Sequence, residues 1–88
     1  MTTESSRDEA ALRALIENEL ERMEDGQRKK VLELARRIHP GLTAEDIRNP
    51  HDFPDLDDPD WHFEDGVLTG IQSVQVVLRA LFRSQNAK

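Results

Sequence analysis

Two histidines and seven carboxylates lie within one short segment, between His51 and Gly66. Imidazole nitrogens and carboxylate oxygens can bind zinc or non-haem iron, and carboxylates alone suit calcium. No register of the segment places oxygen ligands, glycine and the closing glutamate as an EF-hand loop requires, so only an irregular calcium site remains. A divalent-metal site is therefore one interpretation of the segment. It would use two histidines and two carboxylates, His51, Asp52, His62 and Glu64.

Known catalytic motifs do not occur in the sequence. The chain has no cysteine, which excludes a thiolate nucleophile and thiolate metal ligands. There is no nucleophile elbow, no P-loop and no dinucleotide-binding glycine pattern. The neighbouring carboxylates Asp57 and Asp58 would need a cleft that separates their pKa values, and a small helical protein offers none. We therefore expect a protein that is not an enzyme.

The charge of the chain is unevenly distributed. The net charge is −6, and residues 49–78 contain seven acidic residues but no lysine or arginine. Such a segment repels nucleic acid and anionic membranes and attracts a basic partner. The basic clusters at residues 28–30 and 36–37 have no interleaved aromatic residues. We therefore expect no direct nucleic-acid binding and no membrane association.

This acidic segment contains aromatic residues, and a purely solvated linker would lack such residues. Phe53, Trp61 and Phe63 are expected to pin it onto the helices, because each buried aromatic side chain removes a large apolar area from water. The acids would then face outwards and steer a basic partner, with Trp61 as a partly exposed anchor. The predicted partner-binding residues are four aspartates and one tryptophan, Asp55, Asp57, Asp58, Asp60 and Trp61.

The elements that position these residues are helices. An apolar stripe at three- and four-residue steps predicts a first helix over residues 6–39, with residues 1–5 frayed and a capping box at Ser6. Gly26 raises the question of a break. The stripe keeps its register across Gly26, and Glu24 and Arg28 form a favourable i,i+4 pair, so one continuous helix is preferred. The alternative is a monomeric three-helix bundle broken at Gly26.

The rest of the chain is predicted to hold a short helix, a connection and a last helix. Thr43 as an N-cap indicates a short helix over residues 43–48. Residues 49–64 form the expected acidic connection, in which three prolines disfavour regular structure. Residues 65–85 show a broad apolar face at helical spacing, with Gln72 and Gln75 largely off it.

Together these elements predict an all-α protein of one small domain. Its two long helices would pack as an antiparallel pair, and their apolar faces are wider than one neighbour covers, which favours a homodimeric four-helix bundle. The start of the chain has no leader-like pattern and no apolar run is long enough to span a bilayer, so a cytoplasmic location is expected. The predicted function is that of an acidic protein-interaction module. A metal-binding protein and a purely structural assembly subunit are the alternatives.

Overall fold

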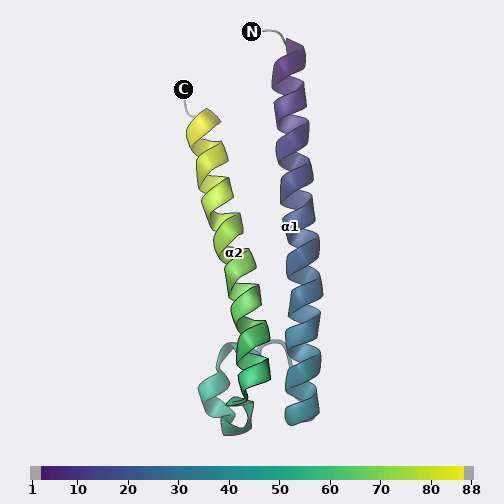
Figure 1. Ribbon diagram of the computed structural model, residues 1–88, viewed down its shortest axis with the longest axis vertical. Helices are drawn as coiled ribbons and strands as arrows, with labels where there is room; N and C mark the ends of the chain where they lie inside the picture. The colour runs from purple at the N-terminus through teal and green to yellow at the C-terminus, as the bar shows by residue number, and fades with distance from the viewer. Residues whose placement is uncertain (1–2, 87–88) are drawn as a thin grey trace.

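The computed structural model describes the backbone of residues 3–86 and the side chains of residues 7–85. Two long helices, α1 and α2, run antiparallel beside each other and are joined by a compact connection at one end (Figure 1). Both chain termini lie at the opposite end. The part of the chain that the structure describes contains no strand. The all-α prediction is therefore confirmed.

Helix α1 spans Thr3–Ile38 and passes through Gly26 without a break. The alternative broken at Gly26 is wrong, since continuity keeps Glu24 next to Arg28, whose Nη2 donates to Glu24 Oε2 over 2.7 Å. The helix already begins at Thr3, so Ser6 lies inside it and the predicted start at Ser6 is wrong. Residues 1 and 2 of the predicted frayed segment lie outside the described residues. Gly41 follows the helix with a positive φ of 90°, a conformation that glycine adopts without strain.

Three single turns of 3-10 helix form the connection: Asp46–Arg48, Pro50–Asp52 and Pro54–Leu56. The first replaces the predicted short helix. Thr43 and Asp46 stabilise it reciprocally, because each backbone N–H donates to the other's side-chain oxygen, over 3.0 and 3.2 Å. The second and third turns begin at Pro50 and Pro54, in the first helical position, where the missing N–H of proline costs nothing.

Helix α2 spans Pro59–Asn86, so it begins before the predicted start at residue 65. Asp58 precedes it, and the Asp58 carboxylate accepts from the Trp61 backbone N–H over 3.0 Å as an N-cap does. Pro59 takes the first helical position, where its missing N–H costs nothing. The last third of the predicted acidic connection is thus the first turn and a half of a helix, which fixes the directions of His62 and Phe63.

Among the residues that the structure describes, the apolar core sits at the connected end of the helix pair. It is made of six buried residues: Val31, Ala35, Leu42, Leu56, Trp61 and Leu68. The molecule is a rod of 57 × 19 × 19 Å with a radius of gyration of 17.6 Å. A compact domain of this length would have a radius of gyration of about 12 Å. Most of the rod therefore lies away from the core, and much of each helix is not covered by the other.

Candidate functional site

The aspartates predicted to bind a partner are largely engaged within the chain. Asp55 Oδ2 lies 2.8 Å from His39 Nδ1, and Asp57 Oδ1 lies 3.0 Å from His62 Nε2. The hydrogen bond with His39 is the main cause of a lowered pKa of Asp55. Asp58 caps α2. These contacts fold the connection, while Asp57 stays exposed, as does Asp60 at the start of α2.

Trp61 is fully buried, with 0% of its surface exposed. Its indole Nε1 donates to the Val31 carbonyl oxygen of α1 over 3.2 Å. The prediction that aromatic residues pin this segment is right for Trp61 and, in part, for the half-buried Phe53. The prediction of a partly exposed Trp61 anchor is wrong, because the early start of α2 turns that side chain towards α1. Phe63, two residues later, is instead 69% exposed.

The proposed metal ligands do not converge. Among the described residues no group of three or more histidine, aspartate or glutamate side chains could hold an ion. His62 is bound to Asp57, whereas Glu64 faces α1, where Gln27 Nε2 donates to it over 3.1 Å and Lys30 Nζ lies 3.3 Å away. His51 and Asp52 lie in a separate 3-10 turn. The structure therefore does not bring His51, Asp52, His62 and Glu64 together as one ligand set, because the helical start of α2 places His62 and Glu64 on different faces.

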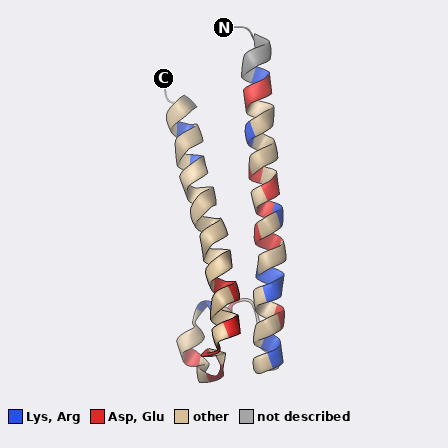
Figure 2. Cartoon of the chain, in the orientation of Figure 1, with Lys and Arg blue, Asp and Glu red and all other residues tan. Residues whose placement is uncertain are grey.

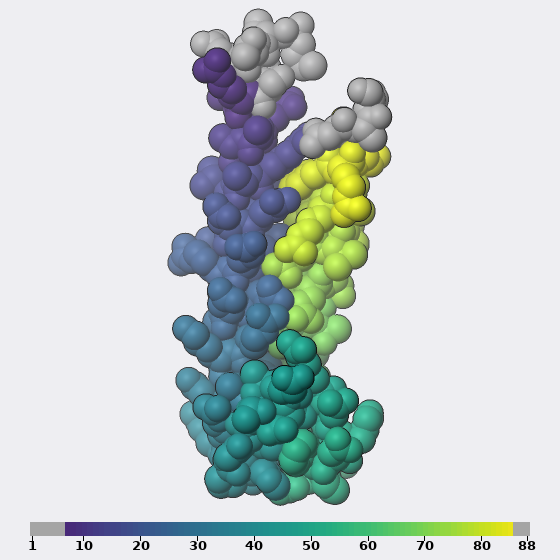
Figure 3. All heavy atoms as spheres, turned by 180° about the vertical axis from the view of Figure 1, so that it is seen from behind, coloured from purple at the N-terminus to yellow at the C-terminus, as the bar shows by residue number. Residues whose placement is uncertain are grey.

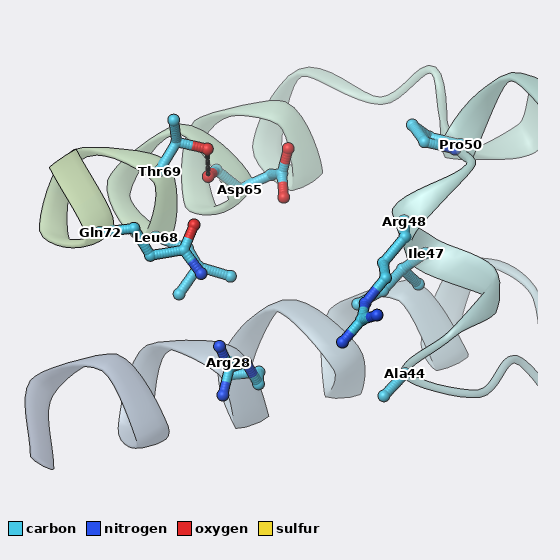
Figure 4. Close-up of a pocket in the computed structure, with 9 residues that line it drawn as sticks. All are labelled: Arg28, Ala44, Ile47, Arg48, Pro50, Asp65, Leu68, Thr69 and Gln72. Carbon is cyan, nitrogen blue, oxygen red and sulfur yellow. Dashed lines mark hydrogen bonds between the residues drawn. The ribbon is translucent and has the colours of Figure 1, made fainter. Parts of the chain in front are cut away.

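A groove of 410 Å³ lies where the connection crosses the helix pair (Figure 4). Nine residues line it: Arg28, Ala44, Ile47, Arg48, Pro50, Asp65, Leu68, Thr69 and Gln72. Two guanidinium groups suggest an anion site. However, Arg28 is held by Glu24, and the Thr69 hydroxyl donates to the Asp65 carbonyl oxygen over 3.1 Å. The lining has no pair of nucleophile and base, which is the arrangement that nucleophilic catalysis requires.

Above the core, polar side chains take part in the contact between the two helices. Gln72 Nε2 and Gln75 Nε2 of α2 donate to the two carboxylate oxygens of Glu24 over 3.1 and 3.3 Å. Gln75 is only 6% exposed, although the sequence placed it off the packed face. The pKa of Glu24 is lowered, chiefly by the Gln72 hydrogen bond. Closer to the connection, Gln27 Nε2 also donates to the Glu64 carbonyl oxygen over 2.8 Å.

Helix α2 also carries apolar residues on its outside, in addition to Trp61 and Leu68, which belong to the core. An outer stripe, at alternating four- and three-residue steps, faces away from α1. It consists of Phe63, Val67, Gly70, Val74, Val77 and Leu81, all exposed. Residues 66–78 contain no charged side chain. Figure 2 shows this as an uncharged middle of α2, between red acidic residues near its start and blue basic residues near its end. The space-filling view shows the C-terminal half of α2 as a ridge along the rod (Figure 3).

Exposed apolar residues of α1 lie on the same side of the helix pair as the outer stripe. Successive residues turn by about 100° in an α-helix. On each helix, the angle can be measured from the direction that points to the other helix. By this measure the outer stripe of α2 turns to one side of the pair, and α1 turns three apolar residues to the same side: Leu12, Ile16 and Met23. All three α1 residues are exposed. The groove of Figure 4 lies on the other side, so the apolar side is not covered by the connection.

Neither helix, within the residues that the structure describes, has a stretch with the length and hydropathy needed to cross a membrane. Comparison with known proteins finds no matching family model, no similar curated protein and no similar solved structure.

Sequence reasoning had recognised the width of the apolar face of α2 but not the direction in which it points. It missed Phe63 as an exposed aromatic residue and Gln75 as a buried amide. One signal could have found both: Asp58-Pro59 is an N-cap followed by proline at the first helical position. A helix that starts there places Trp61, Leu68 and Gln75 on one face and Phe63, Val67 and Val74 on another.

Proposed function

We propose that this protein is a non-enzymatic protein-interaction module whose binding surface is the outer stripe of α2. One observation carries the proposal: the amides and carboxylates lie between the helices, whereas the valines and Phe63 face outwards. A helix in a two-helix hairpin normally turns its apolar residues to its neighbour and its charges to water. Helix α2 has a further apolar face turned away from that neighbour, which is expected of a helix that has a second neighbour.

The exposed area supports this proposal. The chain exposes 6679 Å², whereas a folded monomer of its mass typically exposes about 5,300 Å². The excess is of the order of what one partner contributes to a protein–protein interface of standard size, about 800 Å² or somewhat more. A contiguous apolar patch free of charge marks an interaction site rather than ordinary surface. The homodimeric four-helix bundle expected from the sequence is one form of such an interaction.

Two adjacent valines provide a matched experiment. Val77 belongs to the outer stripe and is 65% exposed, while Val76 is 64% exposed and faces the other side of α2. The chain has no cysteine, so the Val77→Cys and Val76→Cys variants each carry one thiol. We would measure maleimide labelling of both variants inside the cells that make the protein, and again after unfolding in urea.

The proposal predicts slow labelling of the Val77→Cys thiol in cells and rapid labelling of the Val76→Cys thiol. A thiol that a partner covers reacts only in the fraction of molecules in which the site is open to solvent. In urea the two thiols should react equally. Equal labelling in cells would contradict the proposal, because it would mean that the outer stripe is exposed to solvent where the protein works.

A second candidate function is the binding of a basic protein by the acidic connection. The absence of lysine and arginine between residues 49 and 78, together with the exposure of Asp57 and Asp60, favours it. Long-range attraction of this kind raises the association rate and weakens with salt. We would measure binding of a lysine-rich peptide at low and high salt by the unmodified protein and by the double variant Asp57→Asn, Asp60→Asn. Equal binding by the two proteins would contradict this candidate.

A further inference from the structure

The outer stripe of α2 is symmetric about residue 72, and we infer that its partner is the α2 helix of a second copy of this chain, running antiparallel. This inference rests on the proposed function and names the partner. Turning a copy end over end about residue 72 brings Phe63 opposite Leu81, Val67 opposite Val77 and Gly70 opposite Val74. Each large residue of one end then meets a large residue of the other, and each central valine meets a glycine.

Alternating steps of four and three residues are the spacing with which two helices interlock along a seam. In the outer stripe this spacing persists from Phe63 to Leu81 without a polar residue. On α1 the corresponding side is apolar only in its N-terminal half, at Leu12, Ile16 and Met23, and carries Lys30 and Arg37 farther on. The continuous seam therefore belongs to α2, and α2 is the helix that can pair with its own copy.

Gly70 supports a close approach at the centre of this seam. A Cβ atom added at Gly70 would meet nothing within 4 Å in the chain, so packing against α1 does not require a glycine there. A glycine in a helix interior costs about 1 kcal/mol relative to alanine. In the antiparallel pair, the space above Gly70 receives the Val74 side chain of the second copy, and this happens twice because of the two-fold symmetry.

Charge selects the antiparallel orientation over the parallel one. The start of α2 carries Asp60, Glu64 and Asp65, and its end carries Arg79 and Arg83. In the antiparallel pair each acidic end lies at the level of the basic end of the other copy. A parallel pair would place acid beside acid and arginine beside arginine. The preference should be strongest at low salt, since salt screens charges that are more than about 8–10 Å apart at physiological ionic strength.

The test uses purified protein and single cysteines at exposed positions of α2. The Val67→Cys variant and the Val77→Cys variant, one of them lengthened by a tag, are mixed and oxidised, and the disulfide-linked products are separated by mass. A disulfide requires Cα atoms within about 7 Å. The inferred pair brings residue 67 next to residue 77 of the other copy but keeps identical residues about 15 Å apart. The Val76→Cys variant serves as the control, since it lies off the seam.

The inference predicts that the mixed disulfide between the two variants dominates and that neither variant links to itself or to the Val76→Cys control. Self-linked products of each variant would overturn it in favour of a parallel pair. The absence of any specific product, with protein of monomer mass, would overturn pairing with a second copy altogether. The proposed function would then be tested by the labelling experiment in cells. Protection of the Val77→Cys thiol there would indicate that a different partner covers the outer stripe.

Discussion

A negative charge on the outer stripe should dissociate the paired protein, and the same charge one residue earlier should not. Val77→Asp places a carboxylate on the stripe, whereas Val76→Asp places it on the opposite flank of α2. Both valines are exposed to nearly the same extent in the single chain, 65% and 64%. Valine and aspartate have similar helix propensities, so neither variant should disturb the helix pair itself.

The magnitude follows from what the partner would cover. Complete burial of a valine side chain contributes about 1.5 kcal/mol or more, so burial of the part of Val77 now exposed contributes about 1 kcal/mol in each chain. Leaving a buried carboxylate unsatisfied costs at least a further 1–3 kcal/mol in each chain. Because two-fold symmetry doubles both contributions, Val77→Asp should weaken pairing by at least about 4 kcal/mol. This corresponds to roughly a thousandfold rise in the dissociation constant.

Sedimentation equilibrium over a range of protein concentrations measures this constant for the unmodified protein and both variants. Far-ultraviolet circular dichroism would show that the helix content of the variants is unchanged. We expect Val76→Asp to associate like the unmodified protein and Val77→Asp to be a monomer at the same concentration. Equal association of the two variants, or loss of association in both, would refute the assignment of the seam to the outer stripe.

Four other predictions concern the single chain. The pKa of Glu24 is lowered in the folded protein, chiefly by its hydrogen bond from Gln72, so the folded state favours the carboxylate. This stabilisation is present above the ordinary glutamate pKa of about 4.3 and is lost as the pH falls through the lower, folded-state pKa. Melting temperatures between pH 7 and pH 3 should therefore fall less steeply for Glu24→Gln than for the unmodified protein, and an unchanged slope would contradict the role of Glu24. Trp61→Ala should cost about 3–5 kcal/mol in urea unfolding, because it empties the centre of the only apolar core found among the described residues; a loss below about 1 kcal/mol would mean that Trp61 does not pin the connection. Gly26→Ala should stabilise the protein by about 1 kcal/mol, since α1 is continuous there and an added Cβ meets open space, whereas destabilisation would indicate a bend at Gly26. Zinc, calcium and manganese ions should leave the melting temperature unchanged, and a saturable rise that His62→Ala abolishes would support the metal interpretation.

Hydrophobic spacing was sufficient to predict the first helix and its continuity. The register of apolar residues across Gly26 and the i,i+4 pair of Glu24 with Arg28 both require an unbroken helix, and the structure has one. The antiparallel packing of α1 and α2 was also predicted, since each has an apolar face that the other can cover. These features depend on local spacing and chain length, which the sequence contains directly.

The sequence analysis places the start of α2 at residue 65 and not at Pro59, because three prolines in the connection disfavour regular structure. The Asp58-Pro59 pair is nevertheless a capping signal. That error moved Trp61 from a helix into a loop and thereby made it an exposed anchor instead of a buried one. The polar contact between the helices could not be predicted from periodicity either. Gln72 and Gln75 reach Glu24 across more than forty residues of sequence, and a pattern within one helix does not specify which of its faces meets the other.

The width of the apolar face of α2 did indicate from the sequence that one neighbour would not cover it. The structure adds the direction of that face and the symmetry of its residues about position 72. Neither property is visible until the face that packs on α1 is known, because the same residues could have formed the contact within the chain.

The mass of the unmodified protein in solution tests the central claim most directly. Sedimentation equilibrium from low to high micromolar concentration should give a mass of twice the 10.1 kDa of the chain, decreasing towards the monomer only on dilution. A mass of one chain at every concentration would contradict pairing through the outer stripe of α2.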